Sequence, residues 1–165
     1  MPILDDRSLD FWSHSSEQTV RFGARLGELL LPGDVLTLSG ELGAGKTTLV
    51  TGLARGWGSA DQVTSPTFVL VNDYRRPDGL HLWHLDGYRL ANAAEAVAIG
   101  FDDLLADGGV MVIEWPEHLA EALPAERLSV TLRWSDQTRR GLRFEAHGDH
   151  YAALLSRFRQ ASFGL

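Results

Sequence analysis

The residues with the clearest chemical meaning form a glycine-rich segment that begins at Gly40 and ends at Thr47. The segment reads GELGAGKT and matches the pattern G-x-x-x-x-G-K-[ST] at every fixed position. Glycines let the backbone bend so that successive N–H groups point at one anion. In such a loop the lysine, here Lys46, reaches the β- and γ-phosphates, and the hydroxyl of Thr47 ligates magnesium. The segment therefore predicts a site for Mg²⁺ and the phosphates of ATP or GTP.

A glycine turn that binds nothing is the alternative, and two observations argue against it. The preceding residues, 35–39, are β-branched and apolar and predict a buried strand, while a helix is predicted from Lys46 to about Gly56. The free N–H groups of that helix would face the same phosphates. Lys46 is also the only lysine among fifteen basic residues. It stands where a compact ammonium is wanted and a planar guanidinium would fit poorly.

Two carboxylates follow apolar strands and could complete such a site. Glu114 ends a strand predicted over 109–114, where a second acidic group would hold the metal directly or through water. Asp86 ends a strand predicted over 80–86 and could orient the attacking water or join the metal shell. Each could instead be a carboxylate that merely ends a strand. His84 alternates with Asp86 and could share its face, although a packed histidine explains it more simply.

Further polar residues lie in two predicted connections. Thr64, Ser65 and Thr67 supply hydroxyls in a loop after the predicted helix, where switch loops of P-loop nucleotidases sense the γ-phosphate. Arg139 and Arg140 lie between two later strands, where either could contact phosphate or remain solvated. The five tryptophans are interpreted as core or interface anchors.

The elements that must position these residues follow from capping, periodicity and turn signals. Ser15 and Gln18 form a capping box that opens a helix, which ends before a turn at 32–34. A hairpin turn is predicted at 75–79, and Asp149 is predicted to cap a final helix. The other predictions are strands over 128–134 and 142–146, forming an antiparallel pair, and helices over 92–98 and 101–106. This order predicts one domain over residues 1–165, a three-layer α/β sandwich of the P-loop NTPase type with a mixed parallel and antiparallel sheet.

Composition narrows the function classes. The chain has 165 residues, a net charge of −7 and no cysteine, so disulfides and thiolate chemistry are excluded. No stretch approaches the roughly 20 apolar residues of a membrane span, and the acidic N-terminus does not resemble a signal peptide, so we expect a cytoplasmic protein. A basic footprint typical of nucleic-acid binding is also missing. Any role on a nucleic acid is therefore expected to run through a partner.

Four motifs then occur in a fixed order: GELGAGKTT from Gly40, TSPTF from Thr64, HLDGYR from His84 and EWP from Glu114. Together they resemble the TsaE family, also called YjeE, over residues 16–140. The resemblance implies a P-loop ATPase that binds ATP and Mg²⁺ and hydrolyses ATP slowly. It further implies action on the TsaB–TsaD heterodimer in threonylcarbamoyladenosine modification of tRNA, with the tRNA held mainly by the partners.

The resemblance also implies roles for individual residues. Lys46, Asp86 and Glu114 match catalytic positions, and Thr47 and Glu114 match the metal positions. The nucleotide-contacting positions are Ser16, Glu41, Leu42, Gly43, Ala44, Gly45, Lys46, Thr47, Thr48, Thr64, Ser65, Thr67, and one or both of Arg139 and Arg140. Gly87 departs from the family pattern, where a bulkier apolar residue is expected, so the local rigidity of that loop is in question.

Two other functions fit the phosphate loop. A small-molecule kinase would usually carry an arginine-rich lid, for which Arg139 and Arg140 are too few. A nucleotide-gated assembly module would need binding without required hydrolysis. The sequence leaves the catalytic base open between Asp86, a hydroxyl of the 64–67 loop and substrate-assisted chemistry.

Overall fold

The computed structural model describes residues 3–41, 43–63, 71–89, 93–98 and 100–165. The predicted loop residues Thr64, Ser65 and Thr67, and Leu42 of the phosphate loop, lie outside these ranges. The strands are β1 (Ile3–Leu4), β2 (Ser8–Ser13), β3 (Val35–Ser39), β4 (Val71–Arg75), β5 (His81–Asp86), β6 (Val110–Glu114), β7 (Arg127–Trp134) and β8 (Arg140–His147). The α-helices are α1 (Ser16–Leu29), α2 (Lys46–Trp57), α3 (Ala93–Ala98), α4 (Phe101–Ala106) and α5 (Asp149–Phe163), and the 3₁₀ helices are η1 (Gly87–Arg89) and η2 (Pro116–Leu119).

The described strands form one eight-stranded mixed sheet in the order β1-β2-β8-β7-β3-β6-β5-β4. Its centre is parallel, because β3 pairs in parallel with β6 and β7, and β5 pairs in parallel with β6. Antiparallel strands flank this centre on both sides. The carboxyl ends of β3, β5 and β6 therefore meet at one edge, which is where open α/β sheets bind ligands.

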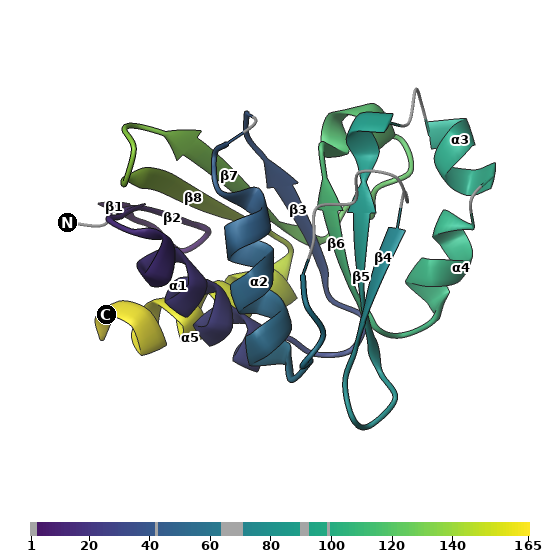
Figure 1. Ribbon diagram of the computed structural model, residues 1–165, viewed down its shortest axis with the longest axis horizontal. Coiled ribbons are helices and arrows are strands. Elements are labelled where there is room, and N and C mark those ends of the chain that lie inside the picture. Colours follow the sequence, from purple (N-terminus) through teal and green to yellow (C-terminus); the bar gives the residue numbers. More distant parts are fainter. Residues whose placement is uncertain (1–2, 42, 64–70, 90–92, 99) are drawn as a thin grey trace.

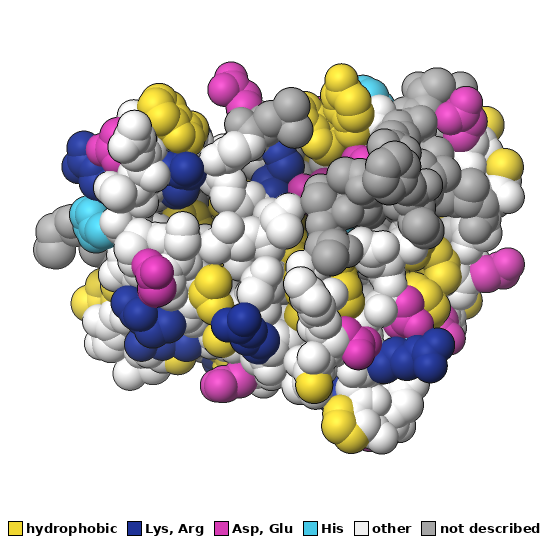
Figure 2. Space-filling view, in the orientation of Figure 1, with side chains coloured by type: hydrophobic (Ala, Val, Ile, Leu, Met, Phe, Trp, Pro, Cys, Tyr) yellow, Lys and Arg dark blue, Asp and Glu magenta, His cyan; other side chains and the backbone are white. Residues whose placement is uncertain are grey.

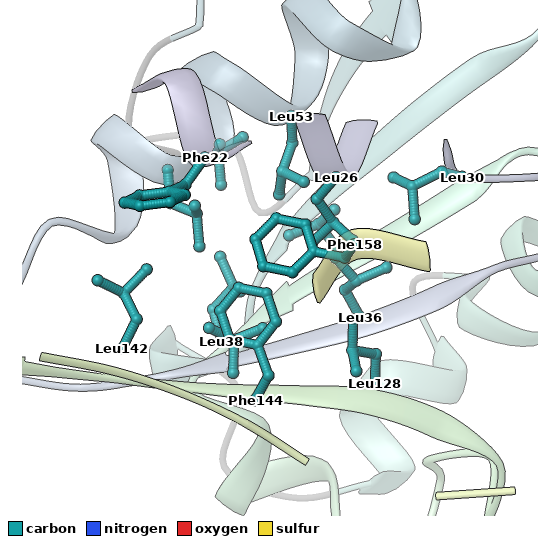
Figure 3. Close-up of a cluster of buried hydrophobic side chains, with 14 of the residues drawn as sticks. Phe22, Leu26, Leu30, Leu36, Leu38, Leu53, Leu128, Leu142, Phe144 and Phe158 are labelled. Carbon is teal, nitrogen blue, oxygen red and sulfur yellow. The ribbon is translucent and has the colours of Figure 1, made fainter. Parts of the chain in front are cut away.

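Helices cover two faces of the sheet and make the predicted three layers. Figure 1 shows α1, α2 and α5 grouped together, away from α3 and α4. The larger core, shown in Figure 3, joins α1, α2 and α5 to the sheet through buried side chains that include Leu26, Leu53, Leu36, Phe144 and Phe158. A smaller core packs α4 and η2 against the other face of the parallel strands, around Phe101, Met111 and Ile113. Strand alternation explains the division, since successive side chains of a strand point to opposite faces.

Helices α1 and α2 pack so closely that glycine is required where they meet. A Cβ at Gly23 would lie 2.6 Å from the carbonyl oxygen of Leu49, and a Cβ at Gly27 would collide with the carbonyl of Leu53. The contacts advance along both helices in the same direction, so the two helices are parallel. Their N-termini therefore lie at the same end of the molecule, and both face the edge where the parallel strands end.

Most predicted elements are confirmed, including the capped helix α1, in which the Ser15 hydroxyl accepts from the N–H of Gln18. Strands β1 and β2 were not predicted, although Leu9 and Phe11 alternate with more exposed residues. One prediction is wrong. Asp149 does not cap α5, because Gly148 occupies the N-cap position, and the Asp149 carboxylate accepts from Arg7 at 2.7 Å instead. Within the described part of the chain, no helix has the length and apolar character needed to cross a membrane.

Candidate phosphate-binding site

The glycine-rich segment connects the carboxyl end of β3 to the first residue of α2. Gly40, Gly43 and Gly45 all have positive φ, at 151°, 82° and 101°. Gly45 is the N-cap of α2, so the helix begins at Lys46 with its first N–H groups directed toward the loop. Such a helix start, with its positive dipole end, is suited to an anion. The predicted order of strand, loop and helix is confirmed.

The Lys46 side chain folds back over the loop. Its ammonium donates to the carbonyl oxygen of Gly40, and to that of Glu41 at 3.1 Å. Only 6% of the residue is exposed. Burial lowers the pKa of the Lys46 ammonium below its usual range, while the carboxylates of Glu114, Glu117 and Asp86 act in the opposite direction. The one lysine of the chain is therefore a buried cation with three carboxylates near it.

The two predicted carboxylates come together because their strands are neighbours. Asp86 pairs with Glu114 in the parallel register of β5 and β6, and both alternate onto the face that α2 covers. Gly87 explains how the chain turns here, since a Cβ at that position would lie 2.7 Å from the carbonyl oxygen of Glu114. A bulkier residue would push η1 away from β6. The departure at Gly87 thus corresponds to a close backbone approach beside both carboxylates.

His84 orients Glu114 through a buried chain of hydrogen bonds that sequence reasoning did not find. The Nε2 of His84 bonds to a carboxylate oxygen of Glu114. Because a carboxylate only accepts, Nε2 donates, while Nδ1 shares a hydrogen bond with the Tyr74 hydroxyl at 3.2 Å. Asn72 donates in turn to that hydroxyl at 3.4 Å. These hydrogen bonds connect β4, β5 and β6. His84, at their centre, is fully buried and has no contact with solvent. The alternation of His84 with Asp86 was the available signal, but the simpler interpretation as a packed histidine was incomplete.

Trp115 also belongs to the site, although the sequence suggested only a core or interface anchor. Its ring lies 4.5 Å from the Lys46 ammonium, within range of a cation–π interaction. Trp115 is the only described residue other than glycine with a positive φ, 54°. Such a backbone is costly for a bulky side chain and is often found at functional sites. On the outer side, Tyr88 packs against the Trp115 ring with ring centroids 5.2 Å apart.

Of the two arginines predicted as alternatives, Arg140 lies against the loop. Its Nε donates to the carbonyl oxygen of Gly43 at 3.2 Å, and its Cγ would lie 3.7 Å from a Cβ at Gly45. Arg139 pairs with Asp136 at 2.8 Å. That contact and two backbone N–H bonds hold the pKa of the Asp136 carboxyl far below its usual range. The structure therefore brings Arg140, and not the Arg139 guanidinium, into contact with the glycine loop.

The remaining predicted residues take simpler positions. Ser16 is exposed in the first turn of α1, whose N-terminus lies at the same end as that of α2. Glu41 and Gly43 are exposed in the loop, and Ala44 is buried there. Thr47 and Thr48 are half-buried in the first turn of α2.

The donor set fits magnesium bound together with phosphate. Magnesium usually takes one or two protein oxygens, with phosphate oxygens and waters completing the shell. Thr47 and Glu114 are oxygen donors of that kind. Among the described residues, no group of three or more His, Cys, Asp or Glu side chains is arranged to hold a metal.

The chain is similar in sequence and in fold to known proteins of one family. Residues 13–142 match the family model described as threonylcarbamoyl adenosine biosynthesis protein TsaE. The chain is 37% identical over 149 residues to the tRNA threonylcarbamoyladenosine biosynthesis protein TsaE of Bacillus subtilis, covering 90% of this chain and 92% of that protein. It is 43% identical over 121 residues to the protein of that name from Treponema pallidum, covering 73% and 88%. The crystal structure of Bacillus subtilis YdiB superposes with a TM-score of 0.77 at 32% identity, covering 98% of this chain and 97% of that one.

Proposed function

Because this chain belongs to the TsaE family, which takes part in threonylcarbamoyladenosine biosynthesis for tRNA, we propose that it is the ATPase of that pathway. It binds ATP with Mg²⁺ at the loop from Gly40 to Thr47 and hydrolyses it slowly. The observation that carries the proposal is the placement of Lys46. This single buried lysine lies at the start of α2, on the loop carbonyls of Gly40 and Glu41, with Asp86 and Glu114 acting on its charge.

Each residue has a defined task in this proposal. The loop N–H groups and the α2 N-terminus bind the phosphates, and Lys46 exchanges its loop carbonyls for β- and γ-phosphate oxygens. Thr47 and Glu114 would hold Mg²⁺, which supplies charge neutralisation at the phosphates. His84 fixes the Glu114 carboxylate in one orientation. Asp86, in register with Glu114, orients the attacking water.

The partner in the proposal is the TsaB–TsaD heterodimer. Hydrolysis on this chain would reset that complex between rounds of tRNA modification, and the partners would hold the tRNA. The net charge of −7 supports this division, because direct tRNA binding would favour a basic surface. Figure 2 shows basic and acidic side chains interspersed on the face in view.

The proposal is tested by reconstituting tRNA modification with the TsaB–TsaD heterodimer and TsaC, the protein expected to make the threonylcarbamoyl adenylate that TsaD uses. We expect repeated rounds of modification only when this protein and ATP are both present. Lys46→Ala should abolish ATP binding and that support, whereas Arg139→Ala, outside the loop contact, should retain both. Strong phosphate transfer to a small acceptor without partner proteins would instead identify a kinase. Full support over many rounds from a variant that binds but does not hydrolyse ATP would identify an assembly module.

A further inference from the structure

Trp134 is an exposed aromatic residue at the edge of the phosphate loop. It is the last residue of β7, and 55% of its surface is accessible. Leu128, Val130 and Leu132 of the same strand are buried in the larger core, together with residues of α2 such as Leu53. Strand alternation places Trp134 on that same face, two residues beyond Leu132. Its side chain therefore belongs to the face that carries α2 and the loop.

Strand β7 runs directly beside the glycine loop before it reaches Trp134. A Cβ at Gly40 would lie 2.6 Å from the carbonyl oxygen of Leu132. A Cβ at Gly45 would lie 3.7 Å from Cδ2 of Leu132. The strand contacts both ends of the loop, so its exposed last residue extends past the loop toward solvent.

Arg140 joins Trp134 to the loop. Its guanidinium carbon lies 5.9 Å from the centre of the Trp134 ring, while its Nε donates to the carbonyl oxygen of Gly43. The arginine is anchored further by the carbonyl oxygens of Asp136 at 2.6 Å and Arg139 at 2.9 Å. The indole ring is thus separated from the phosphate loop by one fixed guanidinium group.

We propose that Trp134 forms the wall against which the nucleotide base stacks. This inference rests on the proposed function, because it concerns the base of a nucleotide whose phosphates bind at Gly40 to Thr47. A flat indole offers stacking area to any base, so Trp134 supplies affinity without distinguishing adenine from guanine. The ligand class is a nucleoside triphosphate, with the larger purine ring system covering more of the indole than a pyrimidine does.

Trp12 provides a matched control within the chain. It is also an exposed tryptophan, at 46%, with the guanidinium carbon of Arg133 5.7 Å from its ring. Its neighbours in β2, Phe11 and Ser13, are buried, so Trp12 points to the opposite face of the sheet. The two tryptophans share exposure and an arginine neighbour and differ in their position relative to the loop.

Calorimetric titration with ATP and with inorganic tripolyphosphate, both with Mg²⁺, tests the proposal on the full chain. Trp134→Ala should weaken ATP binding by roughly 5- to 150-fold, the range for loss of one base–aromatic stack. It should leave tripolyphosphate binding unchanged, because that ligand has no base. Trp134→Phe should recover most of the ATP affinity, and Trp12→Ala should bind both ligands as the unmodified protein does.

The outcomes separate this inference from the proposed function. Unmodified protein that binds neither ligand would overturn the proposed function and this inference with it. ATP bound no more tightly than tripolyphosphate, or unaffected by Trp134→Ala, would overturn the stacking wall and leave the phosphate site intact. If Trp134→Ala weakened the binding of ATP and of tripolyphosphate equally, Trp134 would support the shape of the loop and would not stack on the base. That result would also overturn the proposal.

Discussion

Two histidine–carboxylate pairs lie at opposite ends of the parallel strands. At the carboxyl end, His84 bonds to Glu114 beside the phosphate loop. At the amino end, His150 lies 2.6 Å from Asp34, the residue that precedes β3. The five residues of β3 separate the two ends by about 16 Å. The chemistry of the pairs is similar, but their surroundings differ.

The difference lies in how each carboxylate is used. Both oxygens of Asp34 have partners, since one bonds to His150 and the other accepts from the N–H of Leu31 at 2.8 Å. Among the described residues, the one hydrogen bond to the Glu114 carboxylate comes from His84. The first pair is a saturated structural junction between β3 and α5. The second holds a carboxylate in place with capacity for a further ligand, which the proposed metal site requires.

Removing each carboxylate in turn should separate these roles most strongly. Glu114→Ala should lower ATP turnover by at least roughly 100-fold, the scale of losing one preorganised electrostatic group. Asp34→Ala should leave turnover per folded molecule unchanged and lower the free energy of unfolding by roughly 1–3 kcal/mol, because the Leu31 N–H loses its buried partner. Phosphate release and urea denaturation measure the two effects. A comparable loss of turnover in Asp34→Ala would show that the amino end is not merely structural.

Removing the histidines tests the comparison through stability. His84 is fully buried and hydrogen-bonds to both Tyr74 and Glu114, so His84→Ala should cost roughly 2–4 kcal/mol of unfolding free energy. The His150 side chain is 42% exposed, so His150→Ala should cost less than about 1 kcal/mol. Urea denaturation of both variants measures these costs.

A second variant shows whether His84 positions Glu114 or only fills space. His84→Gln retains an N–H that can donate to Glu114, and should recover much of the turnover lost in His84→Ala. If the alanine variant, once folded, hydrolyses ATP at the unmodified rate, His84 has a packing role alone.

The two ends were not equally predictable from the sequence. The glycine loop at the carboxyl end could be predicted, because strand, glycine turn and helix follow one another within 23 residues, 35–57, and each has a local signal. The chain of hydrogen bonds that connects Asn72, Tyr74, His84 and Glu114 could not be predicted. It depends on the pairing of β4 with β5 and of β5 with β6, which brings together residues far apart in sequence. The choice of Arg140 over Arg139 at the loop likewise depends on the register of β7 and β8. Local sequence patterns therefore did not predict the contacts that depend on pairing between distant strands.

The smallest expected effect concerns the cation at the carboxyl end. Burial lowers the pKa of Lys46 below its usual 10.5, so the unfolded chain binds this proton more tightly than the folded one. The charged ammonium therefore destabilises the fold below its lowered pKa. This penalty is relieved as pH rises through the lowered value toward 10.5.

Lys46→Met removes this dependence, and Lys46 is the only lysine of the chain, so no other lysine obscures it. Relative to the unmodified protein, the variant should be most stable at neutral pH, and its relative stability should fall as the pH approaches 10.5. Urea denaturation of both proteins from pH 7 upward measures the difference, in which titrations common to the two proteins cancel. A relative stability of Lys46→Met that rises with pH would mean that the loop carbonyls and the nearby carboxylates stabilise the ammonium more than burial destabilises it. In that case the Lys46 ammonium would be fully compensated by its partners, as the Asp34 carboxylate is at the other end. The two ends would then differ only at Glu114.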